Sequence, residues 1–249
     1  MSGHNKWAKI KRKKGVNDAK RGRLFTRLIK EMTIAARDGG GNIGGNPRLR
    51  LAVEKAQAAN MPAENIKRAI KRGTGELPGV SYEEATYEGF APAGVALMIE
   101  CVTDNKNRTV AEIRNLLEKN NGKLGATNSV AHMFHRRGMI AVPRTSYNED
   151  ELMNIIIDAG ADDMKTEEDV YQIITMPENF ERVRLALQTK GVKIDEAEVQ
   201  LLPEMTIQVE GKEAEQVLKL IEALEDHDDV QHLYANFDID EKVLAEFNT

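Results

Sequence analysis

The 249-residue chain has little cysteine, few aromatic residues and no long apolar run. A single cysteine, Cys101, excludes an intrachain disulfide, and its place in the apolar run 95–102 predicts a small core residue rather than a nucleophile. No run approaches the roughly 20 apolar residues of a membrane span. The basic N-terminus lacks the apolar stretch of a signal peptide and the serine enrichment of a mitochondrial transit peptide. We therefore expect a cytoplasmic protein with no membrane segment.

Patterns of catalytic or metal-binding residues are also missing. The glycine-rich segment 39–45 has neither a strand before it nor the Gly-Lys-Ser/Thr ending of a phosphate loop. His132 and His135 would face opposite sides of a strand, with no cysteine or carboxylate to complete a zinc site. The acidic residues of 226–229 lack the spacing of a calcium loop, which favours a solvated turn. We expect no enzyme, no catalytic or metal site, no cofactor and no small-molecule substrate.

What the sequence does have is a very uneven distribution of charge. Residues 1–75 hold 19 Lys and Arg against 5 Asp and Glu, whereas the other 174 residues hold 16 basic and 35 acidic side chains. The net charge of −5 hides this division. A basic segment of this density is expected to bind a polyanion, here nucleic acid, while the acidic body is repelled by it. The repulsion would orient the protein on its partner.

The strongest basic signal is an arm formed by residues 1–16, with six basic side chains between Lys6 and Lys14. Like charges repel, so we expect the arm to be mobile until a partner neutralises it. Trp7, the only tryptophan, could stack on an exposed base or anchor the arm to the rest of the protein. The candidate nucleic-acid-binding residues of this region are Lys6, Trp7, Lys9, Lys11, Arg12, Lys13, Lys14, Lys20, Arg21 and Arg23.

Three helices are expected after the arm. Apolar residues spaced three and four apart predict the first near 17–37. Asn46 as N-cap and Pro47 at the first helical position open the second, and the third runs from about 62 to 73. Together they predict a three-helix bundle with a basic outer surface, followed by a linker. The surface residues of the third helix are Lys67, Arg68, Lys71 and Arg72.

Beyond the linker, apolar strands alternate with amphipathic helices. Four strand–helix units with extra strands suit two α+β sandwiches of the ferredoxin-like kind. Spacing alone leaves open whether neighbouring units pair or whether the first pairs with the fourth, which nests one domain inside the other. The expected strands are 85–88, 95–102, 130–134, 139–142, 170–176, 195–202, 205–209 and 230–238, and the expected helices 109–120, 148–159, 178–190 and 212–225.

A second candidate contact is the run 103–109, which lies between a buried strand and a helix start. Backbone N–H groups point outward at such a junction and attract anions. In the alternative interpretation, Asp104 or Asn107 caps the helix. Arg108 then pairs with Glu112 one turn further on. The candidate phosphate-binding residues of the run are Asn105, Lys106, Asn107 and Arg108.

Four motifs in fixed order, over 3–11, 46–50, 72–75 and 103–109, resemble the YebC family of probable transcriptional regulators. A mitochondrial relative of that family is the translational activator of cytochrome oxidase. Asn5 replaces a usual serine, and the connection at 43–45 is less acidic than in the family. The resemblance implies a helical N-terminal domain and two α+β domains, the third inserted into the second. The implied boundaries are 1–78, 79–132 with 204–249, and 133–203.

The resemblance also implies a non-enzymatic nucleic-acid-binding protein. Some members are described as DNA-binding transcription regulators, and others resemble ribosome-associated factors that help translation through proline-rich stretches. We expect RNA-binding and translation regulation, with ribosomal RNA preferred to DNA as the partner, because the basic residues spread over an arm and several helices. A DNA-binding transcription regulator is the first alternative. A protein-interaction adaptor that uses the acidic body is the second.

Overall fold

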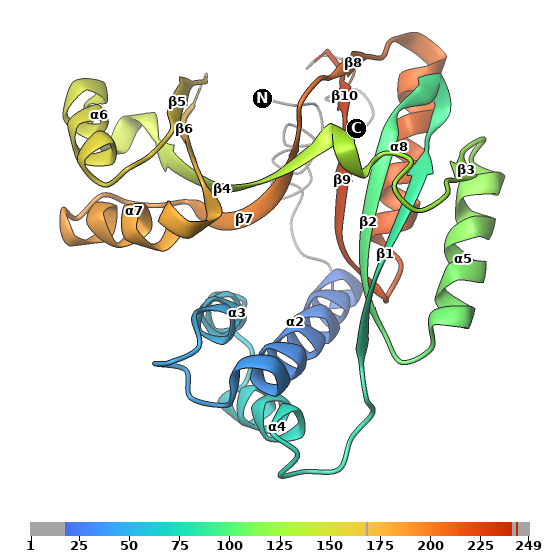
Figure 1. The fold of residues 1–249 in the computed structure, drawn as a ribbon, viewed down its shortest axis with the longest axis horizontal. Helices are drawn as coiled ribbons and strands as arrows, with labels where there is room; N and C mark the ends of the chain where they lie inside the picture. The colour runs from blue at the N-terminus through green and yellow to red at the C-terminus, as the bar shows by residue number, and fades with distance from the viewer. Residues whose placement is uncertain (1–17, 168, 241–242, 244–249) are drawn as a thin grey trace. The chain divides into compact units, whose positions relative to one another are not determined.

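The computed structural model describes residues 18–167, 169–240 and 243. Helices and mainly antiparallel sheets make up a mixed α and α+β protein. The chain divides into two compact units, one of residues 132–205 and one of the described residues on either side (Figure 1). Among the described residues, no helix is long and apolar enough to cross a membrane.

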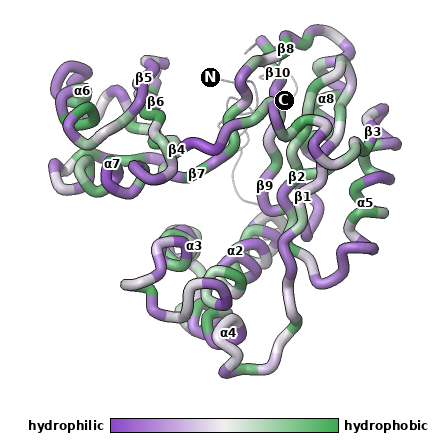
Figure 2. The backbone as a smooth tube through the Cα atoms, viewed as in Figure 1, coloured by the Kyte–Doolittle hydropathy of each residue, from purple (hydrophilic) through white to green (hydrophobic). Residues whose placement is uncertain are grey.

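The larger unit begins with three helices, α2 (Asp18–Gly39), α3 (Pro47–Ala58) and α4 (Ala63–Gly73). Asn46 caps α3 as expected, since its side-chain oxygen accepts a hydrogen bond of 3.0 Å from the backbone N–H of Leu49. Hydrophobic residues recur along these helices in Figure 2, and one face of each is buried. Their shared core comprises Leu28, Met32, Ala35, Ala36, Leu49, Ala52, Val53, Ala56, Met61, Ile66 and Ala69.

A close approach between α2 and α4 explains one glycine of the 72–75 motif. A Cβ atom on Gly73 would overlap the carbonyl oxygen of Thr33 and lie 2.7 Å from the Cβ of Ala36. Only glycine fits at such a contact without moving one helix. Gly75 has a φ of 81°, in the left-handed region that favours glycine. The motif is therefore a packing and turn motif in this fold.

The same unit continues as an α+β layer. Its sheet has the strand order β3-β1-β2-β9, and all neighbours are antiparallel. Helices α5 and α8 pack against this sheet around a common apolar core. The strands are β1 (Glu83–Phe90), β2 (Ala96–Thr103), β3 (Lys123–Leu124) and β9 (Val230–Ala235), and the helices are α5 (Lys106–Lys119) and α8 (Gly211–Glu225). The amphipathic helix expected at 212–225 is confirmed as α8, with Val217, Leu218, Ile221 and Leu224 fully buried.

The unit of residues 132–205 is a second antiparallel sheet with helices packed on its core. Its strand order is β5-β6-β4-β7. The elements are β4 (Phe134–Pro143), α6 (Glu149–Asp158), β5 (Asp163–Thr166), β6 (Val170–Thr175), α7 (Pro177–Thr189) and β7 (Glu196–Pro203). Its core includes Ile140, Val142, Leu152, Ile156, Tyr171, Ile173, Val183 and Leu187.

The strand expected at 130–134 is wrong. Residues 131–133 form a 3-10 turn, and Phe134 already begins the long strand β4. The buried carboxylate of Glu88 uses the backbone donors that a strand would need. It accepts hydrogen bonds of 2.6, 2.7 and 2.9 Å from the N–H groups of Asn128, Val130 and Ala131.

The strands expected at 205–209 and 230–238 are also modified. The first shrinks to β8 (Ile207–Gln208), which pairs in parallel with β10 (Phe237–Asp238). The second is interrupted at Asn236, whose side-chain oxygen accepts a 2.7 Å hydrogen bond from the backbone N–H of Ala96. A side chain that replaces a backbone partner ends the ladder there.

Candidate nucleic-acid interface

The whole of the predicted arm, residues 1–16, lies outside the described residues. This applies to Lys6, Trp7, Lys9, Lys11, Arg12, Lys13 and Lys14. Lys20 lies in the first turn of α2, and Arg21 beside it is exposed. Binding of nucleic acid by these residues therefore stays a prediction.

Further along α2, basic side chains contact an acidic segment of the same chain. Arg23 Nη2 lies 3.3 Å from Asp226 Oδ1, and Arg27 donates a hydrogen bond to the carbonyl oxygen of Glu225. Burial lowers the pKa of the Arg27 guanidinium, although the nearby negative charges of Glu225 and Asp226 act to raise it. Part of the basic helix thus positions the bundle against the end of α8.

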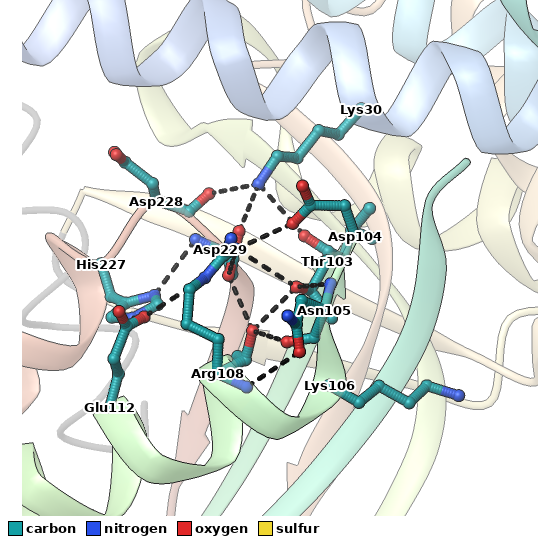
Figure 3. A network of polar contacts seen from close by, with 12 residues as sticks. Lys30, Thr103, Asp104, Asn105, Lys106, Arg108, Glu112, His227, Asp228 and Asp229 are labelled. Atoms are coloured by element: carbon teal, nitrogen blue, oxygen red, sulfur yellow. Dashed lines mark hydrogen bonds and ion pairs between the residues drawn. The ribbon is translucent and has the colours of Figure 1, made fainter. Parts of the chain in front are cut away.

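Lys30, the next basic residue along the same side of α2, is almost fully buried. Its Nζ donates to Asp229 Oδ1 at 2.7 Å, to the carbonyl oxygen of Asp228 at 3.0 Å and to that of Val102 at 3.1 Å (Figure 3). All three donor hydrogens of the ammonium group therefore have partners. Lys30 joins α2 to the end of β2 and to the turn before β9.

Asp229 is the centre of the network in Figure 3. Its second oxygen, Oδ2, accepts hydrogen bonds of 2.8 Å from Arg108 Nη2 and 2.7 Å from Thr109 Oγ1. Burial alone would raise the pKa of this carboxyl, but the bonds from Lys30, Arg108 and Thr109 hold it well below its usual value. The solvated turn predicted at 226–229 is wrong for Asp229, which is 4% exposed.

The sequence of α2 contains a signal for its contact with the 226–229 segment, although the high basic content of the helix hides that signal. Arg23, Arg27 and Lys30 fall at helical spacing and lead to Ile34, which is completely buried. A basic stripe that ends on a buried aliphatic residue marks a second packed face of the helix. The first face, predicted from its apolar residues, meets α3 and α4.

Internal contacts also organise the run 103–109. Asn105 is the N-cap of α5, because its Oδ1 accepts a 3.1 Å hydrogen bond from the backbone N–H of Arg108. The cap predicted at Asp104 or Asn107 is therefore wrong. The Arg108–Glu112 pair is confirmed at 3.8 Å, but Arg108 lies closer to Asp104, at 2.9 Å, and to Asp229.

Lys106 makes a looser contact than Arg108. Its Nζ lies 2.7 Å from Glu83 Oε2, and the two side chains are 50% and 64% exposed. Exposed ion pairs of this kind contribute little and exchange readily with solvent or another anion. Lys106 thus keeps the freedom to bind a phosphate, whereas Arg108 is held by the buried Asp229.

The structure brings Arg23 and Arg108 to one surface hollow. Its charged lining also contains Lys30 and five carboxylates, from Asp104, Glu112, Asp226, Asp228 and Asp229. This excess of negative charge disfavours a phosphate inside the hollow. Glu112, His227 and Asp229 offer ligand atoms within 4.8 Å of one another. A metal ion there would face the cations of Lys30 and Arg108, so the donor set fits a metal poorly.

Two other sequence expectations concern reactive groups. Cys101 is 2% exposed, and burial raises the pKa of its thiol to about 12, which confirms a core residue. The expected placement of His132 and His135 on one strand is wrong, since His132 lies in the 3-10 turn and His135 on β4, where its Nε2 lies 3.3 Å from Glu204 Oε2 on the exposed surface.

Comparison with known proteins identifies two matching domain families. Residues 5–76 match the TACO1/YebC protein N-terminal domain, and residues 82–237 match the TACO1/YebC second and third domain. A probable transcriptional regulatory protein of Dictyoglomus turgidum is 55% identical over 98% of both chains. One of Thermotoga maritima is 55% identical over 99% of this chain and 97% of its own.

A solved structure agrees with these matches. The crystal structure of a conserved hypothetical protein from Aquifex aeolicus has a TM-score of 0.82 and 48% identity, over 91% of this chain and 94% of that one. Family matches and identities of this extent cover nearly the whole sequence. The chain belongs to the TACO1/YebC family.

Proposed function

We propose that this protein is a non-enzymatic, cytoplasmic nucleic-acid-binding regulator that acts on the ribosome and relieves stalling at proline-rich stretches. The observation that carries the proposal is the charge division, with 19 basic and 5 acidic residues in the first 75. Lys and Arg at this density bind phosphate oxygens and release counterions without reading base identity. An acidic body then keeps the rest of the molecule away from the RNA.

The proposal includes an arrangement of three domains. The basic arm and helical bundle take residues 1–78. A discontinuous α+β domain takes 79–132 and 204–249, and an inserted α+β domain takes 133–203. The ferredoxin-like assignment of both α+β domains is part of this proposal, supported by two antiparallel four-stranded sheets with two packed helices each.

Binding would begin with the arm and be completed by the run 103–109. Several cations of the bundle form ion pairs with carboxylates of the same chain and are less available to RNA. The arm would therefore provide most of the affinity. Lys106, in its exposed pair with Glu83, is the residue of the run best able to exchange its partner for a phosphate. A ribosome offers a large folded RNA on which two such separated contacts fit.

Ribosome profiling in a strain that lacks this protein tests the proposal. We expect extra ribosome occupancy at consecutive proline codons, reversed by the intact protein and not by a chain that lacks residues 1–16. The arm deletion should also flatten the dependence of log K on log salt for RNA binding. A deletion that retains full affinity would contradict the role of the arm.

A DNA-binding transcription regulator is the second candidate, favoured by the name of the relatives, probable transcriptional regulatory protein. Unchanged ribosome occupancy, together with tight binding to one defined DNA sequence over random competitor, would establish this alternative. Competition at several salt concentrations separates sequence-specific binding from general attraction to phosphates.

A further inference from the structure

Helix α4 carries four cations on its solvent side. Lys67 and Lys71 are four residues apart, as are Arg68 and Arg72, and all four are exposed. The opposite side of the helix packs into the bundle through Ile66 and Ala69. Side chains four apart lie about 6 Å from each other on one helix face. The four cations therefore form one continuous basic surface, here called the α4 surface.

The α4 surface differs from the other basic parts of the bundle. Arg23 and Lys30 pair with Asp226 and Asp229, and Arg48 contacts Glu31 and Glu84. Within the described part of the chain, no carboxylate forms an ion pair with any of the four cations of the α4 surface. These charges are available to an external partner.

Stabilisation of the helix itself explains only some of the four cations on α4. Lys71 and Arg72 lie in the last turn of α4, where a cation interacts favourably with the helix dipole. Lys67 and Arg68 lie a turn earlier. Each forms a like-charge pair four residues apart with a later cation, which destabilises a helix by about 0.2–0.5 kcal/mol per pair. An anionic partner would remove this repulsion.

The position of the cations along α4 selects among nucleic acids. Helices α3 and α4 are joined by the short turn 59–62, as in a helix-turn-helix pair. A recognition helix, however, contacts base edges with its N-terminal residues. The first turn of α4 contains Glu64, which phosphates would repel, and the cations follow it. This order suits a lateral contact with a phosphate backbone better than insertion into the major groove of DNA.

From the exposure of these cations, their lack of ion pairs with the described carboxylates and their position, we infer that the α4 surface binds the phosphate backbone of a folded RNA. The inference rests on the proposed function and assigns it a binding surface. This surface is separate from the arm and from the run 103–109. Neutralising four cations should release up to four bound counterions, and the salt dependence of binding reports that number directly.

The test compares two variants of the full-length protein. K67A/R68A/K71A/R72A removes the α4 surface, and R114A/K119A/K212A/K219A removes four exposed cations from α5 and α8. Both change the net charge equally. Filter binding to deproteinised ribosomal RNA should show at least tenfold weaker binding for the first variant, with a salt slope smaller by about 3. The second variant should bind as the unaltered protein does.

Further measurements test whether the variants remain folded and whether the partner is RNA or DNA. Thermal melts should show little change in the stability of the α4 variant, because relief of the like-charge repulsion offsets the lost interaction of Lys71 and Arg72 with the helix dipole. K67R/K71R, which keeps the charges, should retain RNA binding. Equal weakening by the two alanine variants, or none by the α4 variant, overturns the inference and leaves the proposed function intact. Weakened binding to a random DNA duplex alone overturns the assignment to RNA. An unaltered protein that does not bind ribosomal RNA overturns both.

Discussion

The ammonium nitrogen of Lys30 lies 2.7 Å from Oδ1 of Asp229, and the two side chains are 7% and 6% exposed. The residues are 199 positions apart in the sequence. Two opposite charges with so little solvent around them depend on each other, because either one alone would be left desolvated and unpaired. The contact fixes the helical bundle to the α+β layer.

Replacement of one partner should therefore be strongly destabilising. We expect Lys30→Met to lower the free energy of unfolding by about 3–5 kcal/mol, since it leaves Asp229 buried with one cation fewer. Urea denaturation measures the change. Arg23→Met, which breaks the more exposed pair with Asp226, serves as control and should cost less than about 1 kcal/mol. Equal effects of the two substitutions would contradict a special role for the buried pair.

The lowered pKa of Asp229 predicts loss of stability in acid. The carboxyl has a pKa of about 3.9 in an unfolded chain and a lower one in the folded protein. Its contribution is therefore complete above about pH 4 and disappears as the pH falls through the folded value. The urea midpoint of the unaltered protein should decline below pH 4. Asp229→Asn should start lower and decline less over the same range.

An exposed carboxylate provides the matched control for this pH series. A hydrogen bond from Lys106 lowers the pKa of Glu83, but this pair is open to solvent and screened by salt. In about 0.5 M NaCl, Glu83→Gln should follow the unaltered protein at every pH. A flatter profile for Glu83→Gln than for Asp229→Asn would assign the acid sensitivity to surface charge instead.

Local sequence patterns predicted the helices well, because their signals lie within a few residues. The Asn46-Pro47 start of α3 is confirmed. The apolar period of α8 places its buried side correctly. Caps depend on finer geometry. Asp104, Asn105 and Asn107 each carry a side-chain oxygen that is able to cap, and the backbone angles place the cap at Asn105.

Contacts between segments that are distant in the sequence were the main features that could not be predicted from it. Asp229 lies in an acidic run that has the composition of a solvated turn, and its partner Lys30 lies 199 positions away in the sequence. Glu88 similarly reaches across some 40 residues to bind backbone N–H groups, and this replaced an expected strand. No periodicity encodes such a pairing, since each depends on how the completed elements pack.

The helix cap of α5 can be tested by two neighbouring substitutions. Asn105→Ala removes the hydrogen bond to the N–H of Arg108 and should cost about 1 kcal/mol of stability. Asn107→Ala, at an exposed position inside the helix, should cost much less or slightly stabilise it. Thermal melts of the two variants check the assignment. The reverse order would place the cap at Asn107.

The contact of α4 with α2 predicts that Gly73→Ala destabilises the bundle. The added methyl group meets the carbonyl oxygen of Thr33 and the Cβ of Ala36, so one helix must shift, at a cost of about 1–3 kcal/mol. Gly22→Ala is a matched control, because a Cβ there meets nothing within 4 Å. This control should be neutral or stabilising, since alanine favours helix more than glycine does. Equal urea midpoints would show that the helices adjust freely.

Substitutions of Lys106 and Arg108 should distinguish a role in RNA binding from a role in stability, since the two residues lie in the same run, 103–109. Lys106→Ala removes an exposed ion pair with Glu83, so the melting temperature should change little. If the residue binds a phosphate, RNA affinity should fall and the salt slope should decrease by about 1. Arg108→Ala takes a hydrogen-bonded cation away from the buried Asp229, so its melting temperature should fall. RNA binding that Lys106→Ala leaves unchanged at every salt concentration would remove this residue from the interface and leave the loop a structural role.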